Sequence, residues 1–384
     1  MSRPRLLIFY DHFYPAYRAG GPVQSLVNFV RAMADTFDCY VVCRSHEAGS
    51  RETLPGVIPD QWINWEEKAR VYYGSPSQQS PAQLRELIEE VQPDRVFING
   101  IYSLYYNILP LRAALRYKDQ HAGCIIVISA RGMLLKGALA QKAFKKKIYL
   151  GLLRMLGWPA RVQWHATDAA EAAAIRQQFG NNIHTGIAEN FPNLLAPIPG
   201  PPKEAGNVVL GTIALIGPMK NHRKVLEALQ QCHQSITWHI YGPVLDAPYW
   251  EDCQALIRQL PANIRVHYHG PVPPPQVPDV MKTFQVFIMP SQSENFGHAL
   301  FEALSAGKPV ITTDTTPFKN LQAATAGITL PAAQLPAGLA TAITTFAEMN
   351  APSFEEYVSG AGRHAQSRFD AVAVRDQYRK LFQL

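Results

Sequence analysis

The chain has 384 residues, of which 47% are hydrophobic and 17% charged, a composition that suits a large globular core and excludes a disordered chain. The formal net charge is +6, and the whole excess lies in residues 1–195, which hold 22 basic and 16 acidic residues against 14 of each in residues 196–384. No run of about 18 apolar residues predicts a membrane span, and five cysteines without Cys-x-x-Cys spacing argue against a disulfide framework or a zinc site and for a reducing cytoplasm.

Short apolar runs alternate with helical patterns from the N-terminus onward. The first run is too short and too soon charged for a signal peptide, so it is interpreted as a buried strand. In the first half, the patterns predict strands at residues 6–10, 39–43, 95–99 and 124–129, and helices at residues 23–34 and 82–91.

A proline-rich segment then interrupts the alternation. Residues 194–207 contain four prolines and two glycines, which cannot sustain a helix or a central strand, so they predict a linker. Beyond it, the patterns predict strands at residues 208–216, 236–241, 264–268, 286–289 and 310–313, and helices at residues 222–233, 248–260 and 297–306.

Two such series indicate an α/β protein with two doubly wound, Rossmann-like domains, at residues 1–193 and 208–368. Ligands of these sheets bind at the carboxyl ends of the strands. We therefore expect the functional site in a cleft between the two domains.

The most informative segment runs from residue 287 to residue 314. A strand, a polar loop, a helix from about Gly297 and a second strand follow one another, with Gly307 and Pro309 closing the helix. At 100° per residue, Glu294 and Glu302 are offset by roughly 80°, so we expect both carboxylates to face one cleft. The free N–H groups of the helix N-terminus favour a phosphate or a sugar oxygen. The alternative is a capping Glu294 and a solvent-facing Glu302, but the apolar neighbours of Glu302 favour a cleft.

Residues 293–311, Ser-Glu-Asn-Phe-Gly-His-Ala-Leu-Phe-Glu-Ala-Leu-Ser-Ala-Gly-Lys-Pro-Val-Ile, resemble the Glu-x7-Glu signature of family-4 retaining glycosyltransferases. These enzymes, the glycosyl transferases of group 1, have the GT-B fold of two facing Rossmann-like domains with an interdomain cleft. The resemblance implies that Glu302 binds the donor ribose and that Glu294 contacts the transferred sugar as a catalytic residue. It implies that sugar hydroxyls and phosphate are held by the backbone of Asn295, Phe296, Gly297 and His298.

The resemblance also implies that the two domains bind different ligands. Residues 1–193 would bind the acceptor and residues 208–368 the nucleotide-sugar. Residues 369–384 resemble the last helix of the family, which crosses back to the N-terminal domain.

Two further loops resemble the family's phosphate-binding segments. Gly20 and Gly21, which alone suggest an ordinary turn, correspond to a Gly-Gly loop that faces the donor diphosphate and the acceptor. Lys220, within Ile-Gly-Pro-Met-Lys-Asn, corresponds to the lysine of an Arg-x4-Lys pair that neutralises the departing diphosphate. Leu215 stands at the arginine position, so His222, Arg223, Lys224 or Arg131 is considered as the second cation.

Three other positions complete the expected site. One segment, Ser-Ala-Arg-Gly-Met-Leu at residues 129–134, resembles a segment of the family members that build polysaccharides. The resemblance implies that Arg131 is catalytic and points into the cleft. The alternative is a structural arginine at the end of a strand. Gly242 and Val272 match places where the family holds the base and the ribose.

A basic segment lies at residues 137–157, where lysines alternate with apolar residues at helical spacing. This pattern suits an anionic membrane surface, and it equally suits a helix packed on its domain with a solvated lysine edge. The lysines concerned are Lys142, Lys145, Lys146 and Lys147.

The function implied is retaining transfer of a hexose-type sugar, from a UDP- or GDP-linked donor, to a glycan or lipid-linked acceptor in surface polysaccharide or lipopolysaccharide synthesis. The alternatives are a non-catalytic nucleotide-sugar- or glycan-binding relative, which Leu215 favours, and a nucleotide-sugar epimerase of the same fold. No Asp-x-Asp metal loop is found, so we expect no cofactor and a metal-independent reaction. Nucleic acid is not an expected partner, and the expected location is the cytoplasm, at the inner face of the membrane where the lysines bind lipid.

Overall fold

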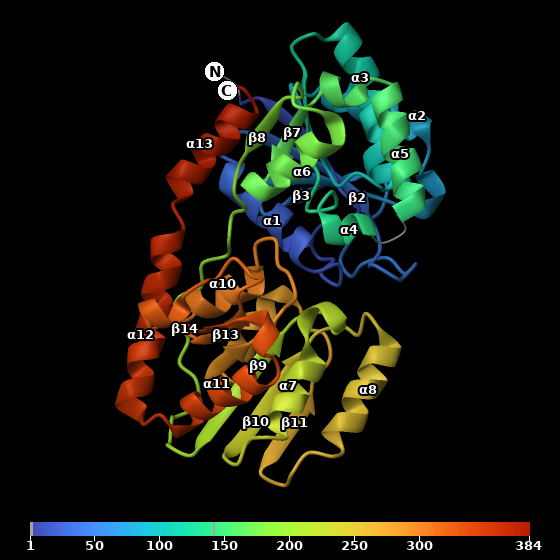
Figure 1. Ribbon diagram of the computed structural model, residues 1–384. Coiled ribbons are helices and arrows are strands. Elements are labelled where there is room, and N and C mark those ends of the chain that lie inside the picture. Colours follow the sequence, from blue (N-terminus) through green and yellow to red (C-terminus); the bar gives the residue numbers. More distant parts are fainter. Residues whose placement is uncertain (1–2, 141–142) are drawn as a thin grey trace. The chain divides into compact units, whose positions relative to one another are not determined.

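The computed structural model describes residues 3–140 and 143–384, which divide into two compact units (Figure 1). The first unit comprises residues 1–191 and 370–384, and the second comprises residues 192–369. Each unit is a largely parallel sheet with helices on its faces, which confirms the predicted α/β class. Among the described residues, no helix combines the length and the apolar character needed to cross a bilayer.

The sheet of the first unit has eight strands in the order β3-β4-β2-β1-β5-β6-β7-β8. Only the β3–β4 pair is antiparallel. All four predicted strands are present within one residue at each end, because they are buried apolar runs of the kind that a sheet covered on both faces requires. The strands are β1 (Arg5–Phe9), β2 (Asp38–Arg44), β3 (Trp62–Trp65), β4 (Ala69–Gly74), β5 (Arg95–Asn99), β6 (Ile125–Ser129), β7 (Gln163–Ala166) and β8 (Thr185–Ile187).

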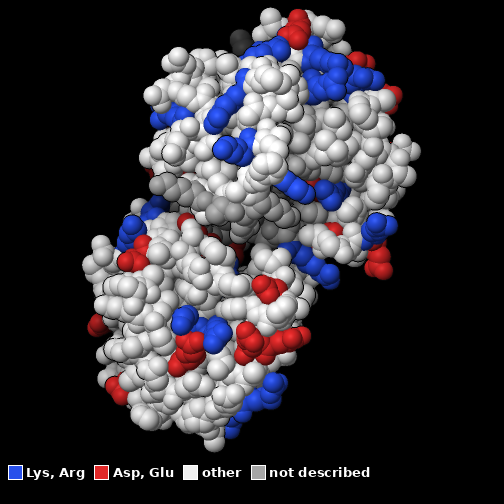
Figure 2. Space-filling view, turned by 45° about the vertical axis from the view of Figure 1, so that its right-hand side comes forward, with Lys and Arg blue, Asp and Glu red and all other residues white. Residues whose placement is uncertain are grey.

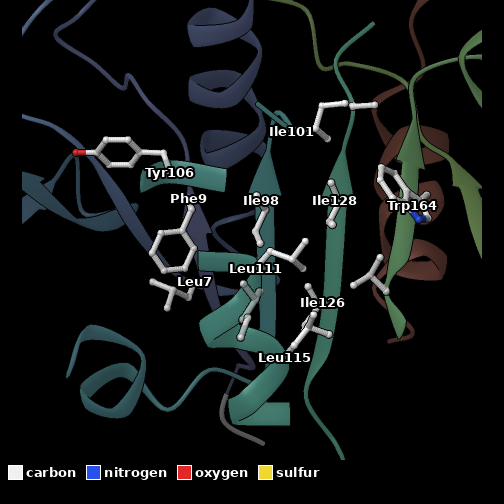
Figure 3. Close-up of a cluster of buried hydrophobic side chains, with 14 of the residues drawn as sticks. Leu7, Phe9, Ile98, Ile101, Tyr106, Leu111, Leu115, Ile126, Ile128 and Trp164 are labelled. Atoms are coloured by element: carbon white, nitrogen blue, oxygen red, sulfur yellow. The ribbon is translucent and has the colours of Figure 1, made fainter. Parts of the chain in front are cut away.

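Helices connect these strands and bury the sheet. Side chains of β1, β5 and β6 pack against Leu111 and Leu115 of α3 in one continuous core (Figure 3). The helices are α1 (Gly21–Met33), α2 (Pro81–Val91), α3 (Leu109–Gln120), α4 (Lys136–Ala140), α5 (Ala143–Met155), α6 (Ala169–Phe179) and α13 (Ala371–Leu381), with the short turns η1 (Pro76–Gln78), η2 (Leu104–Ile108) and η3 (Trp158–Arg161).

The sheet of the second unit has six parallel strands in the order β11-β10-β9-β12-β13-β14. The chain builds outward from β9 to β11 and then returns to place β12 on the other side of β9. The carboxyl ends of β9 and β12 therefore flank the point where the strand order reverses, the usual ligand position in such sheets. The strands are β9 (Asn207–Ile213), β10 (Ser235–Tyr241), β11 (Ile264–Tyr268), β12 (Val286–Ile288), β13 (Val310–Thr313) and β14 (Gly327–Leu330).

Two apolar clusters cover the faces of this sheet. One contains side chains of α7, α8 and α11, and the other contains side chains of α9, α10 and α12. The helices are α7 (His222–Leu229), α8 (Ala247–Ile257), α9 (Val277–Met281), α10 (His298–Ser305), α11 (Ala337–Glu348) and α12 (Ala351–Arg368), with the turns η4 (Pro218–Lys220), η5 (Pro274–Gln276), η6 (Leu321–Ala324) and η7 (Ala332–Gln334).

The predicted linker at residues 194–207 follows the boundary between the two units, at residues 191 and 192, and is grouped with the second unit. The Ile198 N–H donates to the carbonyl of Ala306 at 2.9 Å, and Gln285 Nε2 donates to the carbonyl of Pro202 at 2.8 Å. Prolines prevent regular structure here, but their carbonyl groups still accept hydrogen bonds that fix the segment to its unit.

The last helix belongs to the first unit. The centroid of the Tyr378 ring lies 4.8 Å from that of Phe29. The centroid of the Phe382 ring lies 5.2 Å from that of Phe37 and 5.4 Å from that of Phe97. Tyr378 and Phe382 are fully buried, so these 15 C-terminal residues form part of the first core.

We expect Phe382→Ala to lower the free energy of unfolding of the first unit by about 3–5 kcal/mol, because it removes a fully buried ring from an aromatic cluster. Val372→Ala, on the same helix and 66% exposed, should change it by less than about 0.5 kcal/mol. Urea unfolding measures both variants, and equal effects would contradict the packing described.

Candidate functional site

The N-terminus of α10 is shaped by a glycine. Gly297 precedes the helix with φ 77°, in the left-handed region, and no described side chain caps the helix. A Cβ atom at Gly297 would lie 3.1 Å from the Phe318 ring and 3.2 Å from Leu300 Cδ1, so a larger residue is disfavoured by both backbone and space. The N–H groups of a first helical turn are of the kind that bind an anion or a sugar oxygen.

Glu294 lies in the loop between β12 and α10, four residues before the helix begins. The expectation that a helical angle of 100° per residue aligns Glu294 with Glu302 is therefore wrong, because only Glu302 is helical. The Glu294 carboxylate instead forms an ion pair with Lys220 Nζ, and the two side chains are only 12% and 21% exposed.

Backbone contacts hold this pair in place. Lys220 ends η4, directly after β9, and the next residue, Asn221, donates from Nδ2 to the Pro290 carbonyl at 2.8 Å. Gln292 N–H donates to the carbonyl of Met219 at 2.8 Å. The loops that follow β9 and β12 are thus joined where the strand order reverses, and each contributes one charged residue.

Glu302 lies on α10 among Leu300, Phe301, Ala303 and Leu304, all buried. Burial raises the pKa of the Glu302 carboxyl group to about 7, and a hydrogen bond from Asn193 partly opposes this rise. A substantial fraction of this carboxyl group is therefore protonated at neutral pH. Asn193 has no chemical signature of its own in the sequence.

Gly242 ends β10 in a crowded position. Its N–H donates to the Gly270 carbonyl at 2.8 Å, and a Cβ atom would lie 1.8 Å from the Ala214 carbonyl oxygen. The glycine is therefore required for the close approach of the strand ends, and a role in base binding stays a prediction. Val272 is half-buried in the loop that follows β11. Close by, the Tyr241 and His269 rings stack at 4.5 Å.

The residues of the second unit considered as a second cation are either neutral or ion-paired. Burial, and then the charge of Lys220, lower the pKa of His222 to about 4, so it is neutral at pH 7. Arg223 and Lys224 both form ion pairs with Glu227 on the surface of α7. Leu215, at the family's arginine position, is half-buried.

Arg131 lies in the first unit after β6, with φ 50°. Its guanidinium donates to Asn99 Oδ1 through Nε and Nη2, at 3.0 and 2.5 Å, and through Nη1 to Ser25 Oγ at 2.7 Å and Asn190 Oδ1 at 2.8 Å. All three partners are neutral, so the positive charge persists while the group is held rigidly. Sequence reasoning missed these partners, because single polar residues scattered along the chain carry no spacing signal.

Gly20 and Gly21 lie at the start of α1, where Gly20 precedes the helix with φ 77°. Ser25, on the same helix, accepts the hydrogen bond from Arg131. The structure thus brings Arg131 and the Gly-Gly turn into one network of the first unit, while Lys220, Glu294 and Glu302 belong to the second.

The raised pKa of Glu302 gives a stability prediction. Because this pKa exceeds the unfolded value of about 4.3, Glu302 stabilises the fold fully below pH 4, and the contribution is lost as pH rises through 7. We expect Glu302→Gln to raise the free energy of unfolding at pH 8 by on the order of 1–3 kcal/mol, with little change at pH 4.5.

Urea unfolding of the second unit at both pH values measures this effect. Glu355→Gln, at an exposed position of α12, is the matched control and should show no such pH dependence. A Glu302→Gln variant that is less stable than the wild type at pH 8 would contradict the assignment.

Comparison with known proteins adds to this geometry. Residues 199–362 match the family model of the glycosyl transferases group 1. The chain is 30% identical over 111 residues to the 2-deoxystreptamine glucosyltransferase of Streptomyces kanamyceticus, a match that takes in 29% of this chain and 28% of that enzyme.

Solved structures resemble the whole chain. Anabaena HepE in complex with UDP and glucose has 18% identity and a TM-score of 0.70, with 99% of this chain and 100% of that one covered. Sucrose-phosphate synthase from Thermosynechococcus elongatus has 16% identity and a TM-score of 0.72, over 99% and 100%. WaaG, a glycosyltransferase involved in lipopolysaccharide biosynthesis, has 14% identity and a TM-score of 0.63, over 98% and 99%.

The family match covers most of the second unit and includes Lys220, Glu294 and Glu302, whereas the structural likeness covers both units. Residues 199–362 therefore resemble the glycosyl transferases of group 1, and the chain as a whole has the GT-B fold.

Proposed function

We propose that the chain is a glycosyltransferase that moves a hexose-type sugar from a UDP- or GDP-linked donor to a hydroxyl group of a glycan or lipid-linked acceptor, with retention of anomeric configuration. The observation that carries the proposal is the placement of Lys220, Glu294 and Glu302 around the strand-order reversal of the second unit and the N-terminus of α10. Similar folds occur in structures that contain UDP or UDP-glucose.

Each group has a role suited to its chemistry. Ionised Glu302 accepts hydrogen bonds from the two ribose hydroxyls, and Lys220 with the α10 N-terminus stabilises the diphosphate. Glu294, beside Lys220, accepts from a hydroxyl of the transferred sugar. The backbone of residues 295–298 completes the contacts to sugar and phosphate.

In the proposed reaction the bond from the anomeric carbon to the diphosphate oxygen breaks, and the bond to the acceptor oxygen forms on the same face. The acceptor proton passes to the departing diphosphate. Stabilisation of that leaving group is the main demand on the protein, and Lys220 supplies it in the second unit without a metal. Arg131 contributes a fixed positive charge in the first unit.

Donor recognition gives the first functional test. We expect UDP or GDP to raise the melting temperature of the purified wild type in the presence of EDTA, and Glu302→Gln to abolish this rise although its unliganded fold is intact. Differential scanning fluorimetry over nucleotides and nucleotide-sugars measures it. If no nucleotide stabilises the wild type, the donor site is wrong.

Transfer itself is tested on an acceptor panel. Glu294→Gln should lower kcat by about 100-fold or more, because it removes a group next to the reacting centre, and NMR of the product should show retained configuration. Donor binding without transfer to any acceptor would favour a non-catalytic relative, which the half-buried Leu215 makes a specific alternative. Donor conversion without an acceptor would instead identify an epimerase.

We further propose that α5 contacts an anionic membrane surface, which would place the enzyme at the inner face of the membrane in polysaccharide or lipopolysaccharide assembly. Four exposed apolar side chains recur on one face of this helix, at spacings of four, four and three residues. They are Phe144, Ile148, Leu152 and Met155, with Phe144 78% and Met155 77% exposed.

Lysines border this apolar stripe. On a helical projection, Lys145 and Lys147 lie on its two sides, and both are exposed. Lys146 is left out of the proposed surface, because its Nζ donates to the Ala138 carbonyl at 2.5 Å and lies over the Tyr102 ring. Lys142 lies outside the described residues. Basic side chains predominate on the face of the first unit shown in Figure 2, which suits an anionic partner.

Vesicle co-sedimentation tests this surface. We expect the wild type to bind vesicles rich in phosphatidylglycerol more strongly than phosphatidylcholine vesicles, and Phe144→Ser combined with Met155→Ser to reduce binding at least about tenfold. Ile58→Ser, which removes a 59% exposed side chain elsewhere in the unit, is the control. Equal vesicle binding by the double variant and the wild type would contradict the membrane assignment. So would a wild type that forms dimers in solution when the double variant is monomeric, because the apolar stripe would then be a contact between two copies of the chain.

A further inference from the structure

The Lys220 ammonium already has an anionic partner inside the protein. Glu294 forms an ion pair with it, and the small exposure of both side chains limits screening by water. Any diphosphate that binds Lys220 must therefore share the ammonium with Glu294 or displace it.

Within residues 215–224, no other described side chain offers a free positive charge to relieve this competition. Leu215 is apolar, His222 is neutral at pH 7, and Arg223 and Lys224 are paired with Glu227. A cation at position 215 would let the diphosphate and Glu294 each have a partner. Within residues 215–224, Lys220 serves both.

The two nucleotides of the reaction differ in their charge at this point. In the nucleotide-sugar, the outer phosphate is esterified by the sugar and keeps one ionised oxygen. In the nucleoside diphosphate product, the terminal phosphate has a second ionisation near pH 6, so it carries more negative charge at pH 7. A fixed carboxylate nearby repels the product more strongly than the donor.

We propose that Glu294 acts as an internal counter-ion that competes with the diphosphate for Lys220 and thereby weakens binding of the nucleoside diphosphate more than binding of the nucleotide-sugar. The inference rests on the proposed donor site and adds a second role for Glu294. The same carboxylate that contacts the transferred sugar promotes release of the spent nucleotide, because the ion pair re-forms when the diphosphate leaves.

The test compares UDP and UDP-glucose, or GDP and GDP-mannose where GDP stabilises the wild type, by isothermal titration calorimetry at low salt. We expect Glu294→Gln to bind the nucleoside diphosphate about 5- to 20-fold more tightly than the wild type, with a smaller gain, or a loss, for the nucleotide-sugar. Glu355→Gln makes the same change in net charge at an exposed site and should leave both affinities unchanged.

A double-mutant cycle shows whether the effect passes through Lys220. In a Lys220→Met background, Glu294→Gln should no longer tighten nucleoside diphosphate binding, and added salt should diminish the gain seen with Lys220 present. The expected kinetic signature in active wild type is weaker product inhibition than in Glu294→Gln.

The outcomes separate the two proposals. A wild type that binds neither UDP nor GDP overturns the proposed function, and the inference with it. A wild type that binds nucleotide, alongside a Glu294→Gln variant with equal or weaker affinity for the nucleoside diphosphate, overturns the inference alone. So does a gain of the same size in the Lys220→Met background.

Discussion

The adjacency of β9 and β12 is the constraint on which the second unit's site depends. The two strands pair directly although 72 residues separate the end of β9 from the start of β12. Because both run parallel, their carboxyl ends meet at one edge, so Lys220 and Glu294 can form an ion pair and the loops that carry them are hydrogen-bonded together. The order of strands thus places the charges before any ligand is present.

Glu302 adds a second constraint, which costs folding energy. Burial on an apolar helix raises the pKa of this carboxyl group to about 7 and so disfavours its charged form. The fold would be more stable at pH 7 without the carboxyl group. Two ribose hydroxyls would supply the donors that the unliganded site lacks, apart from Asn193. Stability given up at such a position is typical of a binding site.

In the first unit, the charged group of interest has neutral hydrogen-bond partners. Arg131 is held by amide and hydroxyl oxygens of Asn99, Ser25 and Asn190, and no described carboxylate forms an ion pair with it. Glu171, a buried residue of α6, instead accepts hydrogen bonds from the Gly132 N–H at 2.5 Å and from the N–H and hydroxyl groups of Thr167. The neutral setting preserves the positive charge at the carboxyl edge of this sheet.

Much of the fold was accessible from the sequence, because the central strands are uninterrupted buried apolar runs. Strands β3, β4, β7, β8 and β14 were not predicted. Of these, the edge strands β3 and β8 are short and mostly half-exposed. For the proline-rich segment, composition predicts the absence of a helix but not the carbonyl contacts that fix the chain. At the site, residue types were predictable, whereas the pKa of Glu302, the neutrality of His222 and the pairing of Lys220 depend on three-dimensional surroundings.

The central claim is that Lys220, Glu294 and Glu302 form the donor site, and a crystal structure with a bound nucleoside diphosphate tests it most directly. The account predicts ribose hydroxyls within hydrogen-bond distance of the Glu302 carboxylate, and the diphosphate against Lys220 and the N-terminus of α10. A nucleotide whose ribose lies away from Glu302, or whose phosphates leave Lys220 paired with Glu294 and untouched, would contradict it.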